Sequence, residues 1–401
     1  MVGPERVWVT GPLAPYAEGF CAHLVGQAYS VVGRGNHLRL LAHLSRWMAG
    51  AGLELGDLEP PAVERFLRRR RREGYATKVS PASLSTLLGY LDGLGVLPDR
   101  DDPPPSPSET LLRAYRDYLH RERGLVEGSV RLYEGVARRF LSERSEPLGD
   151  DLARLSGPEI NAFIRREAGR CGIAGAKTAV CGVRSLLGYL HVEGWLPRQL
   201  AAAVPAVAGR RMASLPKAPE PGQVAMMLES CDRDTAVGRR DFAILTVLAR
   251  LGLRAKEVAA LELDDVDWRA GEVVVRGKGP RLERLPLPTD VGEAIADHLR
   301  RGGTRGSCRR LFLRSAAPRR GISRTAVTSI VRRACERAGV PPVGAHRLRH
   351  SVGTQLLRQG ATLPEVAQVL RHKSLLTTAI YAKVDRANLA TLALPWPRGR
   401  A

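Results

Sequence analysis

Apolar positions recur at helical spacing through most of the first 200 residues. Leu38, Leu41, Leu44 and Met48 lie three or four residues apart, as they would on one face of an amphipathic helix. The same spacing predicts further helices around residues 63–67 and 84–91. Residues 1–18 show no periodicity, and we expect an extended N-terminal arm there.

Two stretches of this helical region recur farther along the chain. LLGYLDGLGVLP at residues 87–98 returns as LLGYLHVEGWLP at residues 186–197, with eight identities in twelve positions. LEPPAVERFLRRR at residues 58–70 resembles LSGPEINAFIRRE at residues 155–167, and the offsets lie between 97 and 99 residues. Because order and spacing agree as well as residue type, we interpret these stretches as two copies of one four-helix unit of about 80 residues. Chance likeness between leucine-rich helices is the alternative.

Two proline-rich stretches divide the chain into domains. DRDDPPPSPS at residues 99–108 separates the two helical copies, and residues 198–221 contain four prolines. The predicted order is an arm at 1–18, a first helical unit at 19–98, a linker at 99–108, a second helical unit at 109–197, a linker at 198–221, a C-terminal domain at 222–386 and a tail at 387–401.

After residue 221 the pattern is mixed. Helices are predicted over residues 224–229, 241–251, 291–300 and 325–338, and a further helix begins near His346. Between them, residues 273–275 and 285–287 have the composition of strands and are joined by the turn RGKGPR, which places Lys278 at a hairpin tip. The predicted fold class is therefore mainly α, with a small antiparallel β-sheet in the C-terminal catalytic domain.

The net charge of +21 is concentrated in the second half of the chain. Residues 1–200 hold 27 Lys+Arg against 23 Asp+Glu, whereas residues 201–401 hold 35 against 18. Such an excess predicts a polyanionic partner. A GC-rich genome would also raise the arginine content, but it would do so in both halves, so we favour nucleic acid.

Composition excludes several classes of protein. With 401 residues, 44% hydrophobic and 26% charged, the chain has the composition of two or three globular domains. It has no apolar run of about 18 residues, so we expect no membrane span, and the N-terminus lacks the pattern of a signal peptide. The six cysteines are scattered without a CxxC pair, which argues against a zinc site and suits a reducing cytoplasm.

The candidate chemistry lies near the C-terminus. Three of the nine histidines fall within residues 344–385, and His346, Arg349 and His350 occupy the start of a predicted helix, where anions are favoured. Tyr381 follows His372 by nine residues. Arginine binds phosphate through paired N–H donors and tyrosine can act as a nucleophile, so this set predicts phosphate chemistry on a tyrosine.

The order GLRAKE at residues 252–257, the hairpin lysine, HRLRH at 346–350 and RHKSLLTTAIY at 371–381 resembles the tyrosine recombinase (phage integrase) family. The resemblance is close over residues 217–390 and looser over residues 109–197, which are similar to that family's core-binding domain. It implies a multi-domain DNA clamp with six catalytic positions: Arg254, Lys278, His346, Arg349, His372 and Tyr381.

The resemblance implies transesterification through a 3′-phosphotyrosine on Tyr381, followed by strand exchange through a Holliday junction. Arg254 and Arg349 would clamp the scissile phosphate, since planar guanidinium suits bidentate contacts. Lys278 would protonate the 5′ leaving group, with a solvated turn lysine as the alternative. We expect Glu257 to orient an arginine.

The two histidines of the matching motif, His346 and His372, would donate hydrogen bonds to the phosphate or manage the proton of the tyrosine. The sequence shows no carboxylate cluster of metal-binding type and no glycine-rich loop followed by Lys-Ser/Thr. We therefore expect no metal, no ATP and no other cofactor.

Ten further cations are candidates for DNA contact. Arg371 stands where the family usually has glycine and Lys383 where a histidine often follows, and both add positive charge near the phosphate. Five consecutive arginines begin at Arg68, although such a run can also be a solvated helix face. The candidates are Arg68, Arg69, Arg71, Arg72, Lys177, Arg184, Arg276, Arg347, Arg371 and Lys373.

The predicted function is site-specific recombination for integration, excision or transposition of a mobile element, and the ending LALPWP is similar to recombinases borne on transposons. The alternatives are a type IB-like topoisomerase and a catalytically silent DNA-binding factor. Expected partners are double-stranded DNA at specific sites and further copies of the chain, dimer to tetramer, or related recombinase subunits. The tail at 387–401 is a candidate for packing into a neighbouring subunit. We expect the protein in the bacterial cytoplasm, associated with the nucleoid.

Overall fold

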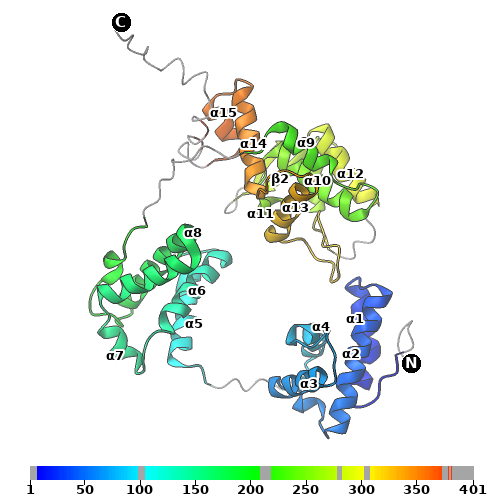
Figure 1. Ribbon diagram of the computed structural model, residues 1–401, viewed down its shortest axis with the longest axis vertical. Coiled ribbons are helices and arrows are strands. Elements are labelled where there is room, and N and C mark those ends of the chain that lie inside the picture. Colours follow the sequence, from blue (N-terminus) through cyan, green and yellow to red (C-terminus); the bar gives the residue numbers. More distant parts are fainter. Residues whose placement is uncertain are drawn as a thin grey trace. The chain divides into compact units, whose positions relative to one another are not determined.

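The computed structural model describes residues 7–97, 104–207, 218–277, 282–301 and 308–372, together with Thr378 and Tyr381. Backbone contacts group the chain into two units, one made of residues 1–99 and 214–401 and the other of residues 100–213. Separate hydrophobic cores form within residues 7–97, 111–207 and 224–348. Helices make up most of the described chain (Figure 1).

The N-terminal residues fold into four α-helices around a core that contains Phe20, Leu41 and Phe66. Ser30 caps the second helix, because its Oγ accepts a hydrogen bond from the Gly33 amide at 3.1 Å. The elements are the 3-10 helix Ala14–Tyr16, α1 (Ala17–Gly26), α2 (Val31–Gly50), the 3-10 helix Leu55–Asp57, α3 (Pro60–Arg72) and α4 (Pro81–Gly93).

The described part of the predicted N-terminal arm is not extended. Leu13 is fully buried, and its amide donates a hydrogen bond to Oγ of Ser45 at 3.0 Å. Helix α1 already begins at Ala17, which is also buried. Too few apolar residues precede Ala17 to give a periodic pattern, and their burial depends on contacts with α2 that lie far along the chain.

The second unit repeats this arrangement with a longer final helix. Helix α8 bends at Gly172, whose φ of 64° and ψ of −173° are not helical. The 3-10 helix Leu200–Ala203 and the buried Val204 pack on this unit, so the first part of the predicted linker at 198–221 belongs to it. The helices are α5 (Pro107–Arg121), α6 (Glu127–Leu141), α7 (Leu148–Ala153) and α8 (Gly157–Val192).

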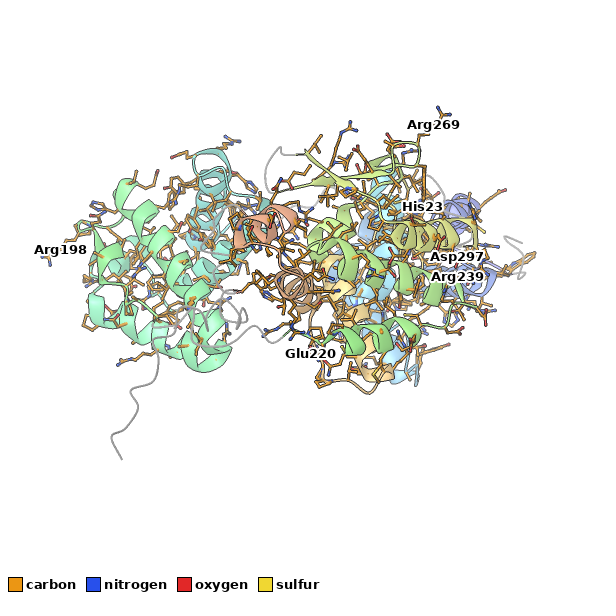
Figure 2. The ribbon with its side chains drawn as sticks, turned by 90° about the horizontal axis from the view of Figure 1, so that it is seen from above. His23, Arg198, Glu220, Arg239, Arg269 and Asp297 are labelled. Atoms are coloured by element: carbon orange, nitrogen blue, oxygen red, sulfur yellow. The ribbon has the colours of Figure 1, made fainter. Side chains whose placement is uncertain are left out.

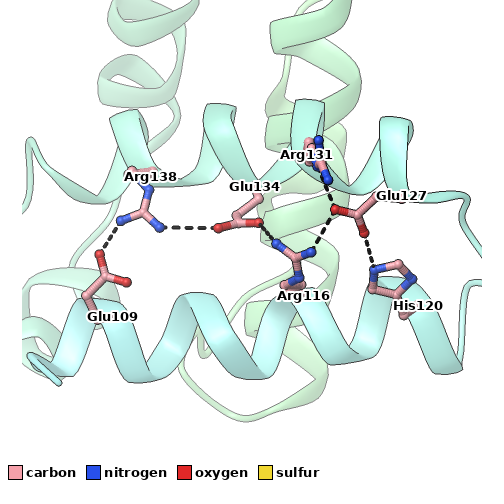
Figure 3. A network of polar contacts seen from close by, with 7 residues as sticks. All are labelled: Glu109, Arg116, His120, Glu127, Arg131, Glu134 and Arg138. Atoms are coloured by element: carbon pink, nitrogen blue, oxygen red, sulfur yellow. Dashed lines mark hydrogen bonds and ion pairs between the residues drawn. The ribbon is translucent and has the colours of Figure 1, made fainter. Parts of the chain in front are cut away.

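An ion-pair network fastens α5 to α6 (Figure 3). Arg116 bonds Glu127 at 2.8 Å and Glu134 at 2.9 Å, so one guanidinium bridges two turns of α6. Arg138 bonds Glu134 at 3.2 Å and also Glu109 on α5. Each exposed pair contributes roughly 0.2–1 kcal/mol, so the network mainly sets the register between the two helices.

The internal repeat predicted from two short matches runs through the whole helical unit. Many equivalent positions are buried in both copies even where the residue type differs, as Phe20 and Tyr115 show. The offset grows from 95 residues at α1 and α5 to 99 at α4 and the second half of α8, as expected for insertions in the connecting loops. Buried equivalents are Leu24 and Leu119, Leu44 and Phe140, Phe66 and Phe163, Leu87 and Leu186, and Leu91 and Leu190.

The C-terminal residues surround the apolar helix α10 (Ala236–Leu251), which contacts α9, α11, α12, α13 and α14. Every helix predicted for this part is present. The remaining helices are α9 (Pro221–Glu229), α11 (Ala255–Ala260), α12 (Thr289–Arg301), α13 (Arg324–Arg337), α14 (Ala345–Arg358) and α15 (Leu363–Val369).

A three-stranded antiparallel sheet lies beside these helices in the order β1-β2-β3. The strands are β1 (Val266–Asp267), β2 (Glu272–Arg276) and β3 (Leu282–Pro286), so the predicted hairpin is confirmed and a short first strand is added. Val273 and Val275 alternate into the core, each 1% exposed. Lys278, at the predicted hairpin tip, lies outside the described residues.

Charged side chains cover the outer faces of the described units, and Arg198 and Arg269 project outward in Figure 2. Among the helices that the structure describes, none is both long and apolar enough to cross a bilayer. The six cysteines are unpaired thiols.

Candidate active site

Helix α14 begins at Ala345 and brings three residues of the HRLRH motif to one end of the domain. Leu348 and Val352 face the core and fix the rotation of the helix. Arg349 is therefore almost fully buried, at 1% exposure. Its Nη1 donates to the carbonyl oxygen of Gly252 at 2.7 Å, and its Nη2 donates to the carbonyl oxygen of Leu370. This arginine joins the ends of α10 and α15.

Arg254 occupies the N-cap of α11, two residues after α10 ends at a left-handed Gly252 with φ of 58°. The carboxylate of Glu257 accepts two hydrogen bonds from Arg254, one from its backbone amide at 2.9 Å and one from its Nη1 at 2.7 Å. The Arg254 side chain is 43% exposed while that of Glu257 is 7% exposed. The guanidinium therefore faces solvent and Glu257 orients it from below, as the sequence predicted.

The pKa values of Glu257 and Arg349 depend on the charges of the arginines around them. Burial alone would raise the pKa of Glu257, but the Arg254 amide and the charges of Arg371 and Arg254 hold that pKa below its ordinary value. Burial lowers the pKa of Arg349 to about 10, with the cations Arg254 and Arg371 acting in the same direction. Arg349 still remains a cation at neutral pH.

Tyr381 lies in the interior beside this cluster, at 1% exposure. Its Oη lies 2.8 Å from Nδ1 of His350, and its ring stacks on His372 with centroids 6.3 Å apart and planes 6° apart. Burial raises the pKa of Tyr381 to about 12, and the charge of Arg349 partly opposes this rise. The residue is a neutral phenol at pH 7, so it must lose its proton to a base in order to act as a nucleophile.

Three histidines surround the phenol. Burial lowers the pKa of His350 to about 4, with further effects of His346, Arg347 and Arg349, so the imidazole is neutral at pH 7 and can accept a proton. His372 contacts Oγ1 of the buried Thr378 at 2.8 Å, and burial lowers its pKa to about 4 as well. The His346 ring lies 4.5 Å from that of His350, and its pKa is lowered by dehydration and by neighbouring arginines.

The structure brings together five of the six predicted catalytic residues. The contacts described above connect four of them: His346, Arg349, His372 and Tyr381. Arg254 joins them because its Nη2 donates to the carbonyl oxygen of Arg371 at 3.4 Å. The sixth, Lys278, lies outside the described residues. His350 was recognised in the sequence as part of the motif, but no role was predicted for it. Its position one helical turn after His346 was the available signal, because residues i and i+4 share a face.

The candidate DNA contacts fall into four groups: exposed, bonded to protein acceptors, half-buried, and outside the described residues. Arg68, Arg72 and Lys177 are exposed. Several others already bond protein acceptors: Arg69 to Glu73 (2.7 Å), Arg71 to Glu64 (3.2 Å), Arg184 to the Val204 carbonyl (2.7 Å) and Arg276 to Asp265 (2.8 Å). Arg347 is half-buried, whereas the side chain of Arg371 is only 6% exposed and bonds Glu257 at 2.8 Å, which removes its guanidinium from the surface. Lys373 lies outside the described residues, as do Lys383 and the tail at 387–401.

The lowered histidine pKa values predict how stability depends on pH. The unfolded chain binds a proton on each histidine near pH 6.5, whereas His350 and His372 in the folded chain do so only near pH 4. Their contribution is fully present above pH 6.5 and is lost as pH falls toward 4. Because both imidazoles are only half-buried and solvent screens them, the loss should be on the order of 1 kcal/mol per histidine between pH 7 and 5. Urea unfolding at pH 7, 6 and 5 should show this loss, and His372→Gln should reduce it. If His372→Gln and the wild type lose stability equally as pH falls, the pKa of His372 is not lowered in the folded chain.

Comparison with known proteins gives consistent results. Residues 220–388 match the model of the phage integrase family. A Sinorhizobium fredii protein named as an integrase/recombinase, y4rA, is 41% identical over 392 residues, which cover 96% of this chain and 95% of that protein. The tyrosine recombinase XerD of Mycobacterium tuberculosis is 32% identical over 293 residues, which cover 68% of this chain and 92% of that protein.

A solved structure shares the fold. The crystal structure of the XerH site-specific recombinase bound to a palindromic difH substrate, a post-cleavage complex, matches with a TM-score of 0.57 and 19% identity. The match covers 84% of this chain and 95% of that one. It confirms the predicted fold class.

Proposed function

Since this chain belongs to the phage integrase family of tyrosine recombinases, we propose that the cluster around Tyr381 is the DNA-cleaving centre. The chain is an enzyme, a site-specific recombinase that cuts and rejoins DNA. A topoisomerase or a silent DNA-binding factor is not favoured, because the relatives that align over most of their length are named recombinases. The reaction serves integration, excision or transposition of a mobile element, at the nucleoid in the bacterial cytoplasm.

The chemistry follows from the contact between Tyr381 Oη and His350 Nδ1 at 2.8 Å, the single observation that carries the proposal. The Tyr381 oxygen attacks the scissile phosphorus while its proton passes to the neutral imidazole of His350. A 3′-phosphotyrosine bond forms and the bond from phosphorus to the 5′ oxygen breaks. The 5′ oxygen takes a proton, for which Lys278 is the candidate donor. Attack by a 5′ hydroxyl on the phosphotyrosine reverses these steps and joins the strands.

The two arginines stabilise the charge that develops on the non-bridging oxygens. Arg254 presents an exposed guanidinium oriented by Glu257, and Arg349 is fixed by two carbonyl oxygens beneath it. Donors held in place before the reaction stabilise the transition state without reorganisation. His346 and His372 line the same region and can donate hydrogen bonds to the phosphate through the nitrogen that carries the proton.

A nicked suicide substrate tests the proposal. Cleavage beside the nick releases a short strand, so the 5′ hydroxyl needed for rejoining is lost and the covalent complex accumulates. With DNA from the flanks of the element that carries the gene, the wild type should give a protein–DNA adduct that survives denaturing electrophoresis. Absence of an adduct at every flank, with DNA binding retained, would contradict the enzymatic role of this site.

Double-stranded DNA and further copies of the chain are the proposed partners. The fold is shared with a recombinase that was crystallised on its DNA substrate, and strand exchange needs more than one active site. The N-terminal helical unit would extend the DNA contact. Its α3 ends in consecutive arginines, of which Arg68 and Arg72 are exposed and have no ion-pair partner among the described residues.

Replacing Arg68 and Arg72 with alanine together should weaken DNA binding at all sequences and leave the cleavage rate at saturating protein unchanged. Loss of two phosphate contacts should reduce the slope of log K against log salt concentration by about 2. Fluorescence anisotropy at several salt concentrations measures this slope. Glu73→Gln is a matched control with the opposite expected effect on DNA affinity. It releases Arg69 from its ion pair and should tighten binding. If the slope of log K against log salt concentration is unchanged in the double variant, α3 does not contact the DNA.

A further inference from the structure

Arg371 has an unusual backbone conformation. Its φ is +52°, in the left-handed region, and among the described non-glycine residues only Ala28 and Lys78 share a positive φ. It directly follows Leu370, the C-cap of α15, a position that favours glycine because a Cβ adds steric cost there. A large side chain at such a position needs a compensating interaction.

The compensating interaction is an ion-pair arrangement inside the domain. The Arg371 side chain is 6% exposed and lies between two carboxylates on different elements. Its Nη2 bonds Oε2 of Glu257 on α11 at 2.8 Å, and its Nε lies 3.5 Å from Oε2 of Glu283 on β3. A buried guanidinium is costly unless it is paired, so the hydrogen bond fixes the position of Glu257, while Glu283, which is 38% exposed, adds a longer ion pair without a hydrogen bond.

The backbone at the same place holds the two catalytic arginines. The carbonyl oxygen of Leu370 accepts a hydrogen bond from Arg349, and that of Arg371 accepts one from Nη2 of Arg254 at 3.4 Å. His372 follows immediately. The left-handed conformation thus turns two successive carbonyl groups toward the phosphate-binding guanidiniums.

Charge balance gives Arg371 a second effect. Glu257 paired with Arg254 alone would neutralise the guanidinium that must face the phosphate. Because Oε2 of Glu257 also bonds Arg371, this carboxylate is shared between two cations. Arg254, Arg371 and Glu257 together keep a net positive charge, which Glu283 opposes only from a partly exposed position 3.5 Å from Arg371.

We propose that Arg371 is a positioning residue for DNA cleavage, which holds Glu257 against Arg254 and ties strand β3 to the site through Glu283. This inference rests on the proposed function. Arg371 does not contact the phosphate, since its side chain is only 6% exposed and its guanidinium bonds Glu257. Its effect should appear in the rate of the covalent step and not in the affinity for DNA.

The test is Arg371→Gly, measured by single-turnover cleavage of the suicide substrate at saturating protein. Glycine adopts φ of +52° without strain, so the variant should fold and bind DNA as the wild type does. The cleavage rate constant should fall roughly 10- to 100-fold, as expected when a charged group at a reacting centre is misplaced. Arg371→Lys, which keeps the charge, should restore part of the rate, and Glu283→Gln should cause a smaller loss. Lys78→Gly, the same kind of change at a left-handed position in the N-terminal unit, is the matched control and should leave the rate constant unchanged.

A double-mutant cycle shows whether Arg371 acts through Glu257. In a Glu257→Gln background, Arg371→Gly should slow cleavage by less than about threefold, because the contact is already lost. Wild-type rates in Arg371→Gly, or an equal loss in both backgrounds, would overturn the inference. If Arg371→Gly does not fold, the same cycle with Arg371→Lys in the wild-type and Glu257→Gln backgrounds gives the decision. A wild type without any adduct would instead overturn the proposed function, so the two failures are distinguishable.

Discussion

Phenylalanine in place of Tyr381 is expected to abolish the covalent protein–DNA complex while DNA binding stays intact. The change removes only Oη, the atom that lies 2.8 Å from His350. The ring can keep its stacking on His372 and its place in the small core formed with Val352, Val366 and Leu370. Loss of one hydrogen bond should lower the stability by about 1 kcal/mol. Loss of the nucleophile should lower the cleavage rate on the order of 10⁴- to 10⁶-fold.

The measurement pairs adduct formation on the suicide substrate with anisotropy on intact DNA. Tyr189→Phe is the matched control, because Tyr189 is another buried tyrosine, at 4% exposure, in the separate hydrophobic core of the second helical unit. It should cleave at the wild-type rate. An adduct formed by Tyr381→Phe would show that another residue is the nucleophile.

Much of this site was predictable from the sequence because it depends on local spacing. The helix that starts at Ala345, the capping position of Arg254 and its contact with Glu257 all involve residues within four positions of each other. Local rules of helix geometry therefore place them. The hairpin was predictable for the same reason, since its two strands are joined by a short turn.

Arg371 shows where prediction from sequence failed. As a cation next to a motif histidine it was expected to contact DNA, yet its side chain turns inward. Its direction is set by a left-handed φ and by two carboxylates that lie about 90 to 115 residues away along the chain. Single-residue charge contains no information about such partners. His350 was missed differently, since its partner Tyr381 comes from a separate segment.

The helical repeat was predictable from the sequence in one half and not in the other. Identity over short stretches revealed the second halves of the two copies. The first halves share no such motif, and only burial relates Phe20 to Tyr115 and Leu24 to Leu119. A core position tolerates any apolar side chain of suitable volume, so the packing pattern persists where residue identity does not.

The two arginines should differ in what their loss does to the fold, although both losses should stop cleavage. Arg349→Met leaves the carbonyl oxygens of Gly252 and Leu370 without their donor inside the domain. We expect its free energy of unfolding to fall by about 2–4 kcal/mol. Arg254→Met removes a side chain that is 43% exposed, and Glu257 keeps its bond to Arg371. Its free energy of unfolding should change by less than about 1 kcal/mol.

Cleavage should fall in both arginine variants by roughly 10²- to 10³-fold or more, since each removes a donor aimed at the developing charge. Urea unfolding at pH 7 and single-turnover cleavage separate the two effects. An equal loss of stability in both variants would show that Arg254 also supports the fold. Unchanged stability in Arg349→Met would mean that the two hydrogen bonds of Arg349 only offset the cost of burying its guanidinium. They would then make no net contribution to the free energy of unfolding. The stability difference therefore tests whether Arg349 joins α10 to α15 as well as binding phosphate.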